Sequence, residues 1–159
     1  MNAPSYPITP AGYAALKARY DHLLGTERPE IVEIVSWAAG NGDRSENGDY
    51  LYGRKRMREI DRELAHLARR MKHARVIDPG EQPAKDKCFF GATVTLADED
   101  DEEKVVTLVG DDEQDASVGK IGWSSPLARA LKGASIGDLR TVKLPSGLKE
   151  WEIVAIRYD

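Results

Sequence analysis

Three acidic residues occupy one short segment of the chain, "AAGNGDRSENGDYLY" (residues 38–52), which lies between two stretches of helical periodicity. Asp43, Glu46 and Asp49 are spaced three residues apart. Carboxylates this close in sequence are accommodated by a helix terminus, by a metal ion or by solvent. Asp43 followed three residues later by Glu46 has the form of a capping box, with Asp in place of Ser or Thr. The first interpretation is therefore that these acids cap a helix.

Metal binding is the alternative interpretation of the same segment. Asp43, Ser45, Asn47 and Gly48 match the first half of an EF-hand loop, but the twelfth position holds Arg54 where calcium needs a bidentate Glu. That mismatch excludes an EF-hand. Two or three carboxylates also suit Mg²⁺, which keeps several waters and shares its ligands with a phosphate or another protein. Nothing else in the chain completes such a site, so a partner would have to supply the remaining ligands.

A dense basic run follows the acids. Residues 54–75 contain nine Lys or Arg and three Asp or Glu, and the run is densest in "RKRMR". Such charges can be a solvated flank of a helix, or they can hold the phosphates of a nucleic-acid strand. The candidate RNA-contacting residues are Arg54, Lys55, Arg56 and Arg58.

Two long helices position these residues. Thr9 and Pro10 form a helix start, and the apolar stripe that follows is interrupted over residues 25–29, where we expect a kink or a phase shift. The second helix carries an unbroken heptad seam, in which Gly53 would permit close backbone approach. The spacing predicts helices over about 9–38 and 45–75, joined by a tip at 39–47, which form an antiparallel coiled-coil finger within residues 1–78. The seam residues are Tyr50, Gly53, Met57, Ile60, Leu64, Leu67, Met71 and Ala74.

The remainder of the chain changes character after a Pro- and Gly-containing linker at residues 79–87. Short alternating runs predict strands near residues 88–96 and 105–109 and in "LRTVKL" and "WEIVAIRY". Ser124 or Ser125 would cap a short helix that starts with Pro126. We therefore expect a second module over residues 88–159, an antiparallel sheet with one short helix, and an α+β fold for the whole chain.

Composition limits the class of protein. The net charge of −4 divides into +2 for residues 1–78 and −6 for residues 79–159. Cys88 is the only cysteine and begins a strand, so we expect it to pack in the core, and no internal disulfide can form. No apolar run approaches the ~18 residues of a membrane span, and the N-terminus has no signal-peptide pattern. The expected location is the cytoplasm, without membrane contact.

The segment "GDRSENGDYLYGRKRMREIDRE" closely resembles the coiled-coil tip of bacterial Gre-type transcript-cleavage factors, and its "GDRSEN" and basic run resemble the GreB branch. "RPEIVE" and "SSPLARALKGASIGDLRTVKLPSG" followed by "WEIVAIRY" extend the resemblance over nearly the whole chain. The resemblance implies an FKBP-like C-terminal domain that docks on the rim helices of RNA polymerase, while the finger enters the secondary channel.

The resemblance also implies a role for each tip residue. Asp43 and Glu46 match the acids that help the polymerase to hold a second Mg²⁺ for cleavage of backtracked RNA. Ser45, Asn47 and Tyr50 match positions that shape the tip. The basic residues of "RKRMR" match a patch that contacts the RNA 3′ end, and Ser125 with Pro126 matches a docking loop.

The sequence therefore predicts an elongation factor that stimulates RNA cleavage by the polymerase and has no nuclease activity of its own. We expect it to be a monomer and to hold no Mg²⁺ in isolation. The alternative is a regulator that occupies the same channel and modulates transcription without cleavage. Relatives of that kind alter the tip acids, whereas Asp43 and Glu46 are both present here.

Overall fold

The computed structural model describes residues 5–41 and 47–159. It contains two compact units. One is Ala14–His73, and the other combines Met1–Tyr13 with Ala74–Asp159. Within the described ranges, no helix is both long and apolar enough to cross a membrane.

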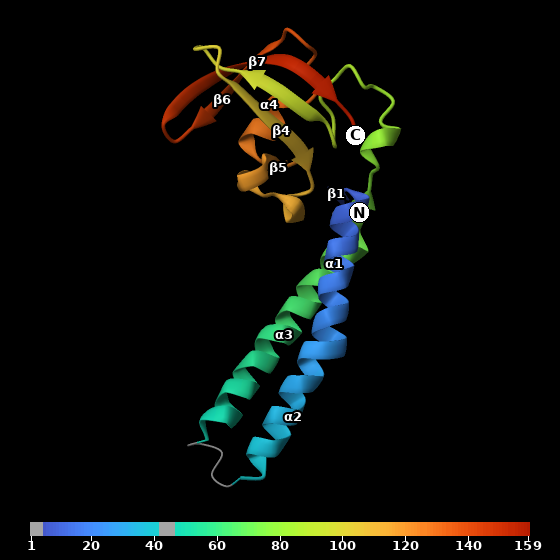
Figure 1. Cartoon of the computed structure of the whole chain (residues 1–159), viewed down its shortest axis with the longest axis vertical. Helices are drawn as coiled ribbons and strands as arrows, with labels where there is room; N and C mark the ends of the chain where they lie inside the picture. The colour runs from blue at the N-terminus through green and yellow to red at the C-terminus, as the bar shows by residue number, and fades with distance from the viewer. Residues whose placement is uncertain (1–4, 42–46) are drawn as a thin grey trace. The chain divides into compact units, whose positions relative to one another are not determined.

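The helices form the predicted antiparallel hairpin. Its elements are α1 (Pro10–His22), one turn of π-helix η1 (Leu23–Glu27), α2 (Arg28–Ala39) and α3 (Gly48–His73). Figure 1 shows α2 and α3 side by side. Thr9 caps α1 as predicted, because its Oγ1 accepts a hydrogen bond from the Gly12 amide at 3.0 Å.

The predicted phase shift is the π-helical turn η1. Pro29 has no N–H to donate to the carbonyl four residues earlier, and its ring would crowd that carbonyl in a continuous α-helix. The chain instead inserts one residue, and the Arg28 amide donates to the Leu23 carbonyl five residues before it.

The apolar seam of the hairpin also follows the prediction. Leu23, Ile31, Ile60 and Leu67 are its buried centre. Gly53 is buried against Val35, and a Cβ added at Gly53 would lie only 2.5 Å from Val35 Cγ2. The close approach expected at this glycine is therefore confirmed. The residues packed around the buried centre are Leu16, Tyr20, Val35, Met57 and Leu64.

The second helix ends two residues before the position near residue 75 that the spacing predicts. α3 ends at His73, and Ala74–Val76 forms strand β2, which pairs in parallel with β1 (Tyr6–Ile8). The Ile77 amide extends this pairing by donating to the Ile8 carbonyl at 2.8 Å. The backbone N–H and C=O groups of Ala74–Val76 therefore bond to β1 and not within a longer helix.

The C-terminal sheet is mixed, not wholly antiparallel as expected. Its order is β5-β4-β3-β7-β6, and every neighbouring pair is antiparallel except β4 with β5. The expected strands and the short helix are present, so the α+β architecture is confirmed, although β3 begins at Thr93 and Cys88 lies before it and not in a strand. The elements are β3 (Thr93–Ala97), β4 (Glu103–Val109), β5 (Lys120–Gly122), α4 (Pro126–Leu131), β6 (Leu139–Leu144) and β7 (Gly147–Arg157), with 3₁₀ turns η2 (Pro79–Glu81), η3 (Asp111–Glu113) and η4 (Ala116–Val118).

One face of this sheet packs on α4 and encloses the core of the unit (Figure 1). Cys88 is fully buried there, as predicted, and its burial raises the pKa of the thiol to about 11. Trp151 is also a core residue. The largest fully buried side chains of this core are Leu96, Leu108, Leu131, Ile153, Val94 and Val106.

Candidate functional site at the end of the helical hairpin

The candidate site lies where the two helices of the hairpin are joined. α2 ends at Ala39, where the Gly40 and Asn41 amides donate to the Trp37 and Ala38 carbonyls. α3 begins at Gly48. Three of the predicted site residues, Asp43, Ser45 and Glu46, lie outside the described residues, so their roles stay predictions.

Asn47 joins the two helices at this end. Its side-chain Nδ2 donates to the Ala38 carbonyl at 2.7 Å, and its Oδ1 accepts from the Tyr50 amide at 3.2 Å. The Asn47 carbonyl also accepts the first helical bond, from Leu51. Asn47 is therefore the N-cap of α3, and this helix does not depend on a capping box at Asp43 and Glu46.

Tyr50 and Arg54, which were expected to serve different roles, contact one another. Arg54 Nη1 donates to the Tyr50 hydroxyl at 3.0 Å, and the guanidinium carbon lies 5.8 Å from the centre of the tyrosine ring. The contact spans one turn of α3 and holds the Arg54 side chain along the helix. Arg54 remains exposed to solvent.

The basic run divides into two kinds of residue. Arg54, Lys55 and Arg58 are exposed, as expected of a surface that meets a polyanion. Arg56 instead lies half-buried and donates from Nε to Glu27 Oε1 at 2.9 Å and from Nη1 to Glu59 Oε2 at 3.2 Å. The bond to Glu27 is the main cause of the raised pKa of the Arg56 guanidinium. An RNA contact by Arg56 would compete with this ion pair.

The three acids of residues 54–75 are all paired with arginines. Glu59 accepts from Arg56, as described above. Arg28 Nε donates to Asp61 at 2.9 Å, and Arg19 Nε donates to Glu63 at 2.8 Å. The hydrogen bond from Arg19 lowers the pKa of the Glu63 carboxyl. These pairs neutralise three of the arginines with the three acids. The charges of Arg54, Lys55 and Arg58 near the hairpin end are not offset by these acids.

The predicted docking residues have a local structural role. Ser125 is the N-cap of α4, because its Oγ accepts from the Ala128 amide at 3.2 Å, and Pro126 occupies the first helical position. The preceding Ser124 amide donates to Asp111 Oδ1 at 2.9 Å. Docking by Ser125 and Pro126 stays a prediction.

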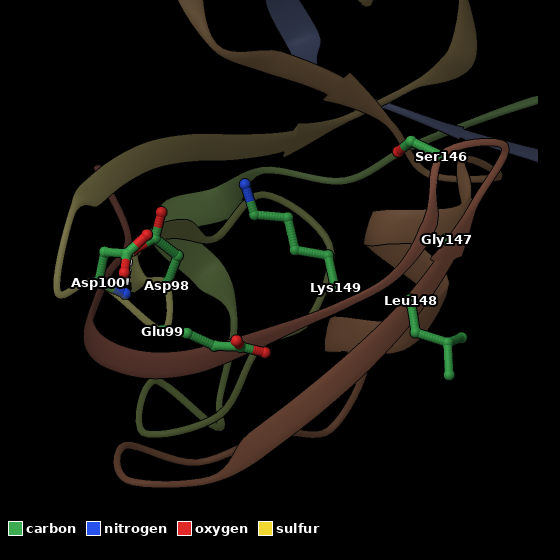
Figure 2. Close-up of a pocket in the computed structure, with 7 residues that line it drawn as sticks. All are labelled: Asp98, Glu99, Asp100, Ser146, Gly147, Leu148 and Lys149. Atoms are coloured by element: carbon green, nitrogen blue, oxygen red, sulfur yellow. Dashed lines mark hydrogen bonds between the residues drawn. The ribbon is translucent and has the colours of Figure 1, made fainter.

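The acidic residues 98–102 form the turn between β3 and β4. Asp98 Oδ1 accepts from the amides of Asp100 and Glu102, each at 2.9 Å. Figure 2 shows Lys149 extending toward Asp98 and Asp100, while Leu148 points away. Within residues 5–41 and 47–159, no three His, Cys, Asp or Glu side chains are grouped so that they could hold a metal ion.

Comparison with known proteins covers both units. A family model described as "Transcription elongation factor, N-terminal" matches residues 6–76, and one described as "Transcription elongation factor, GreA/GreB, C-term" matches residues 82–158. The chain belongs to the GreA/GreB family. Gre factors are transcription elongation factors, which confirms the family that the tip and C-terminal motifs indicated.

Named relatives place this Gre factor on the GreB branch. It is 54% identical over 151 residues to transcription elongation factor GreB of Neisseria meningitidis serogroup B, covering 95% of this chain and 93% of that protein. It is 44% identical over 152 residues to GreB of Pseudomonas aeruginosa, with 95% and 89% covered. Transcription elongation factor GreA of Xanthomonas axonopodis pv. citri is 41% identical over 153 residues, with 96% and 97% covered.

Glu27 is a residue of this Gre factor that sequence reasoning missed. Its carboxylate accepts from Arg56 and lies 3.9 Å from both Arg19 Nη1 and His22 Nε2. Sequence alone does not predict this contact, because only the register of the hairpin brings Glu27 to Arg56. The one available signal was an acid within residues 25–29, where the kink is expected.

Proposed function

We propose that this Gre factor acts on RNA polymerase, enters the secondary channel with its helical hairpin, and stimulates cleavage of the 3′ end of backtracked RNA. The polymerase supplies the active site, and the Gre factor is not a nuclease by itself. Membership of the GreA/GreB family supports the partner, because the family consists of transcription elongation factors.

One observation carries the cleavage role. The segment that joins α2 to α3 contains Asp43 and Glu46 in the sequence, and the first three turns of α3 expose Arg54, Lys55 and Arg58. Cations beside two acids suit a phosphodiester held by its phosphates while the acids attract a cation. A helical hairpin is also a means of carrying such a pair of acids into a narrow passage.

The acids fit Mg²⁺ only if a partner completes the site. Carboxylate oxygens are suitable ligands, but two of them leave most of an octahedral shell to water, to phosphate or to another protein. Mg²⁺ bound there, next to the ion that the polymerase holds, would supply Lewis-acid chemistry for hydrolysis of the phosphodiester. Asp43 and Glu46 would hold the ion, and the exposed arginines would orient the RNA.

The test is a cleavage assay on a stalled, backtracked elongation complex, in which RNA length is followed with Mg²⁺ present. The wild-type factor should shorten the RNA from its 3′ end, whereas Asp43→Asn and Glu46→Asn should bind polymerase equally well and cleave at least tenfold more slowly. Asp49→Asn is the matched control, since it removes the same charge from an exposed acid in the first turn of α3. It should cleave at nearly the wild-type rate.

Two results would contradict this function. Normal cleavage by Asp43→Asn and Glu46→Asn would show that these acids do not act on the reaction. Tight binding of the wild-type factor without any shortening of the RNA would instead indicate a channel regulator that does not cleave.

Substitution of Ser125 by Ala, compared at equal stability, would show whether the start of α4 contributes to docking.

A further inference from the structure

The short turn η3 contacts two different parts of one compact unit. At its start, Asp111 Oδ1 accepts from the Ser124 amide at 2.9 Å, which holds the residue before the predicted docking pair. At its end, the Glu113 carboxylate contacts Thr9, the residue that caps α1. One turn of three residues therefore joins the predicted docking loop to the start of the first helix of the hairpin.

The contact between Glu113 and Thr9 is more than a helix cap requires. Thr9 already caps α1 through its own hydroxyl, which accepts from the Gly12 amide at 3.0 Å. Glu113 Oε2 accepts from the Thr9 amide at 3.0 Å, and Glu113 Oε1 accepts from the Thr9 hydroxyl. Because the two residues are 104 positions apart in the sequence, the carboxylate ties the start of α1 to a turn that follows the strand β4.

Two glycines allow this close approach. A Cβ at Gly12 would lie 2.2 Å from Glu113 Cδ, so glycine leaves room for the carboxylate at this buried position of α1. A Cβ at Gly110 would lie 2.7 Å from the Pro7 carbonyl oxygen, and the Gly110 amide donates to Glu113 Oε2 at 2.8 Å. Among the described residues, Glu113 therefore makes its side-chain hydrogen bonds to the start of α1 and to its own turn.

The helical arm that begins at α1 is long, so a small change at its first turn becomes large at its far end. Residues 10–39 are helical through α1, η1 and α2. At 1.5 Å per residue this arm is roughly 45 Å long, and a tilt of about 5° at its first turn would move its end by about 4 Å. A misplacement of about 1 Å can slow a reaction roughly a hundredfold. The acids of the joining segment therefore need a firmly held helix start.

We propose that Glu113 is a positioning residue: by holding the first turn of α1 against η3, it fixes the path of the hairpin whose joining segment carries Asp43 and Glu46. Glu113 acts only through α1 and contacts neither RNA nor the metal ion. The proposal rests on the proposed function, because the reaction concerned is cleavage of backtracked RNA by the polymerase. Loss of the contact should leave docking intact and slow the cleavage step.

The first test separates affinity from rate. Cleavage in a backtracked complex is measured over a range of factor concentrations, with all variants compared at equal folded fractions. Glu113→Ala should keep the half-saturating concentration within about twofold of wild type and should lower the saturated rate about tenfold. Glu113→Gln, which keeps one acceptor oxygen, should recover most of that rate. Glu81→Ala is the matched control, since it removes an exposed glutamate from another 3₁₀ turn of the same unit, and it should match wild type.

A second variant disturbs the same contact without removing the carboxylate. Gly12→Ala should favour the helix through its propensity, but the new Cβ would displace the Glu113 carboxylate from Thr9. It should therefore lower the saturated rate as Glu113→Ala does. The double variant should be no slower than Glu113→Ala, because the same contact can be lost only once.

A second measurement follows the hairpin in the free factor, without any cleavage. Spin labels at Leu51→Cys and Leu148→Cys, two exposed positions, report the distribution of distances between the hairpin and the sheet. The native Cys88 is fully buried and should not take the label. The two variants that break the Glu113 contact should broaden or shift this distribution, whereas Glu81→Ala should leave it unchanged.

The outcomes distinguish this proposal from the function on which it rests. A saturated rate for Glu113→Ala equal to that of wild type would overturn the proposal, whether or not its affinity for polymerase is weakened. Identical distance distributions in all variants would also overturn it. A distribution that changes only when the Glu113 contact is broken would support the positioning role even if the wild-type factor cleaved no RNA, in which case the proposed function would fail alone.

Discussion

The guanidinium of Arg56 on α3 is paired with the carboxylate of Glu27 in the π-helical turn on the opposite side of the hairpin. The side chains are 24% and 23% exposed, so solvent screens the pair only in part. The pair gives Arg56 a structural role in holding the two sides of the hairpin together, although its sequence neighbours suit an RNA contact.

Breaking this pair should destabilise the hairpin whichever partner is changed. Glu27→Gln and Arg56→Gln should each lower the free energy of unfolding by about 1 kcal/mol, because each removes the main partner of a partly buried charge. Urea denaturation followed by circular dichroism measures both losses.

The same two variants separate stability from RNA contact. If Arg56 acts only through Glu27, both variants should cleave backtracked RNA at similar rates once compared at equal folded fractions. A large cleavage defect confined to Arg56→Gln would contradict that view and restore Arg56 to the RNA-contacting set.

Two glycines of α3 should respond in opposite ways to alanine. Gly48 is exposed in the first turn, and an added Cβ would meet nothing within 4 Å. Gly48→Ala should therefore stabilise the fold by up to about 1 kcal/mol through helix propensity. Gly53→Ala should instead lose about 1 kcal/mol net, because the new Cβ would collide with Val35 Cγ2. Thermal denaturation of the two variants gives the comparison directly.

A rescue experiment checks the reason for the loss at Gly53. Combining Gly53→Ala with Val35→Ala should destabilise the fold less than the two single losses added together, since the second change removes the colliding methyl group. Additive losses would show that the crowding at this point has another source.

Glu113 should matter to the first turn of α1. Its carboxylate accepts from the amides of Thr9 and Gly110, at 3.0 and 2.8 Å, and from the Thr9 hydroxyl. Glu113→Ala should cost about 1–3 kcal/mol, because two part-buried amides lose a charged acceptor. Hydrogen exchange at those amides should become faster in the variant. Glu113→Gln, which keeps one acceptor oxygen, should lose less, and an unchanged exchange rate in Glu113→Ala would contradict this assignment.

The stability of the fold should decline in alkaline solution partly through Cys88. The folded protein retains the thiol proton up to a pKa of about 11, whereas an unfolded cysteine releases it near pH ~8.5. As pH rises through this window, the unfolded state loses its proton first, so the free energy of unfolding falls. Below about pH 8.5 the contribution of Cys88 to the free energy of unfolding does not change with pH.

Cys88→Ala isolates that contribution from other groups that titrate at high pH. The variant should be less stable at neutral pH because of the lost packing, but its stability should fall less steeply between about pH 8.5 and 11. Native wild-type protein should also resist alkylation at pH 8. Parallel pH profiles for the two proteins would show that the buried thiol does not titrate in this way.

The parts of the fold that sequence predicted are those with a repeating local pattern. The heptad seam of α3, the cap at Thr9 and the close approach at Gly53 each follow from residue type and spacing. β1, β2 and β5 were missed because three residues are too few to show an alternating pattern. Their pairing depends on partners far away in the sequence, as with Tyr6–Ile8 and Ala74–Val76.

The candidate site was predictable to a more limited degree. Exposure of Arg54, Lys55 and Arg58 follows from their position outside the seam. The pairing of Arg56 does not, because the face that meets Glu27 depends on the rotation introduced by the π-helical turn. Sequence suggested Asp43 as a helix cap, whereas Asn47 is the residue that caps α3. The proposed roles of Asp43, Ser45 and Glu46 depend on the cleavage experiments.

The extra residue of the π-helical turn η1 aligns the apolar residues of α2 with the seam of the hairpin. An uninterrupted α-helix continuing from Leu23 at steps of four and three would direct Glu27 and Glu30 into the apolar seam. With the inserted residue, Ile31 and Ala38 face α3 instead, and Glu27 is rotated to the edge where Arg56 can reach it. Deletion of a single residue from 24–26 would therefore leave Ile31 and Ala38 seven and fourteen residues after Leu23, where an uninterrupted α-helix directs them to the seam. The surface presented beside the joining segment would be kept, and only the π-helical turn would be lost.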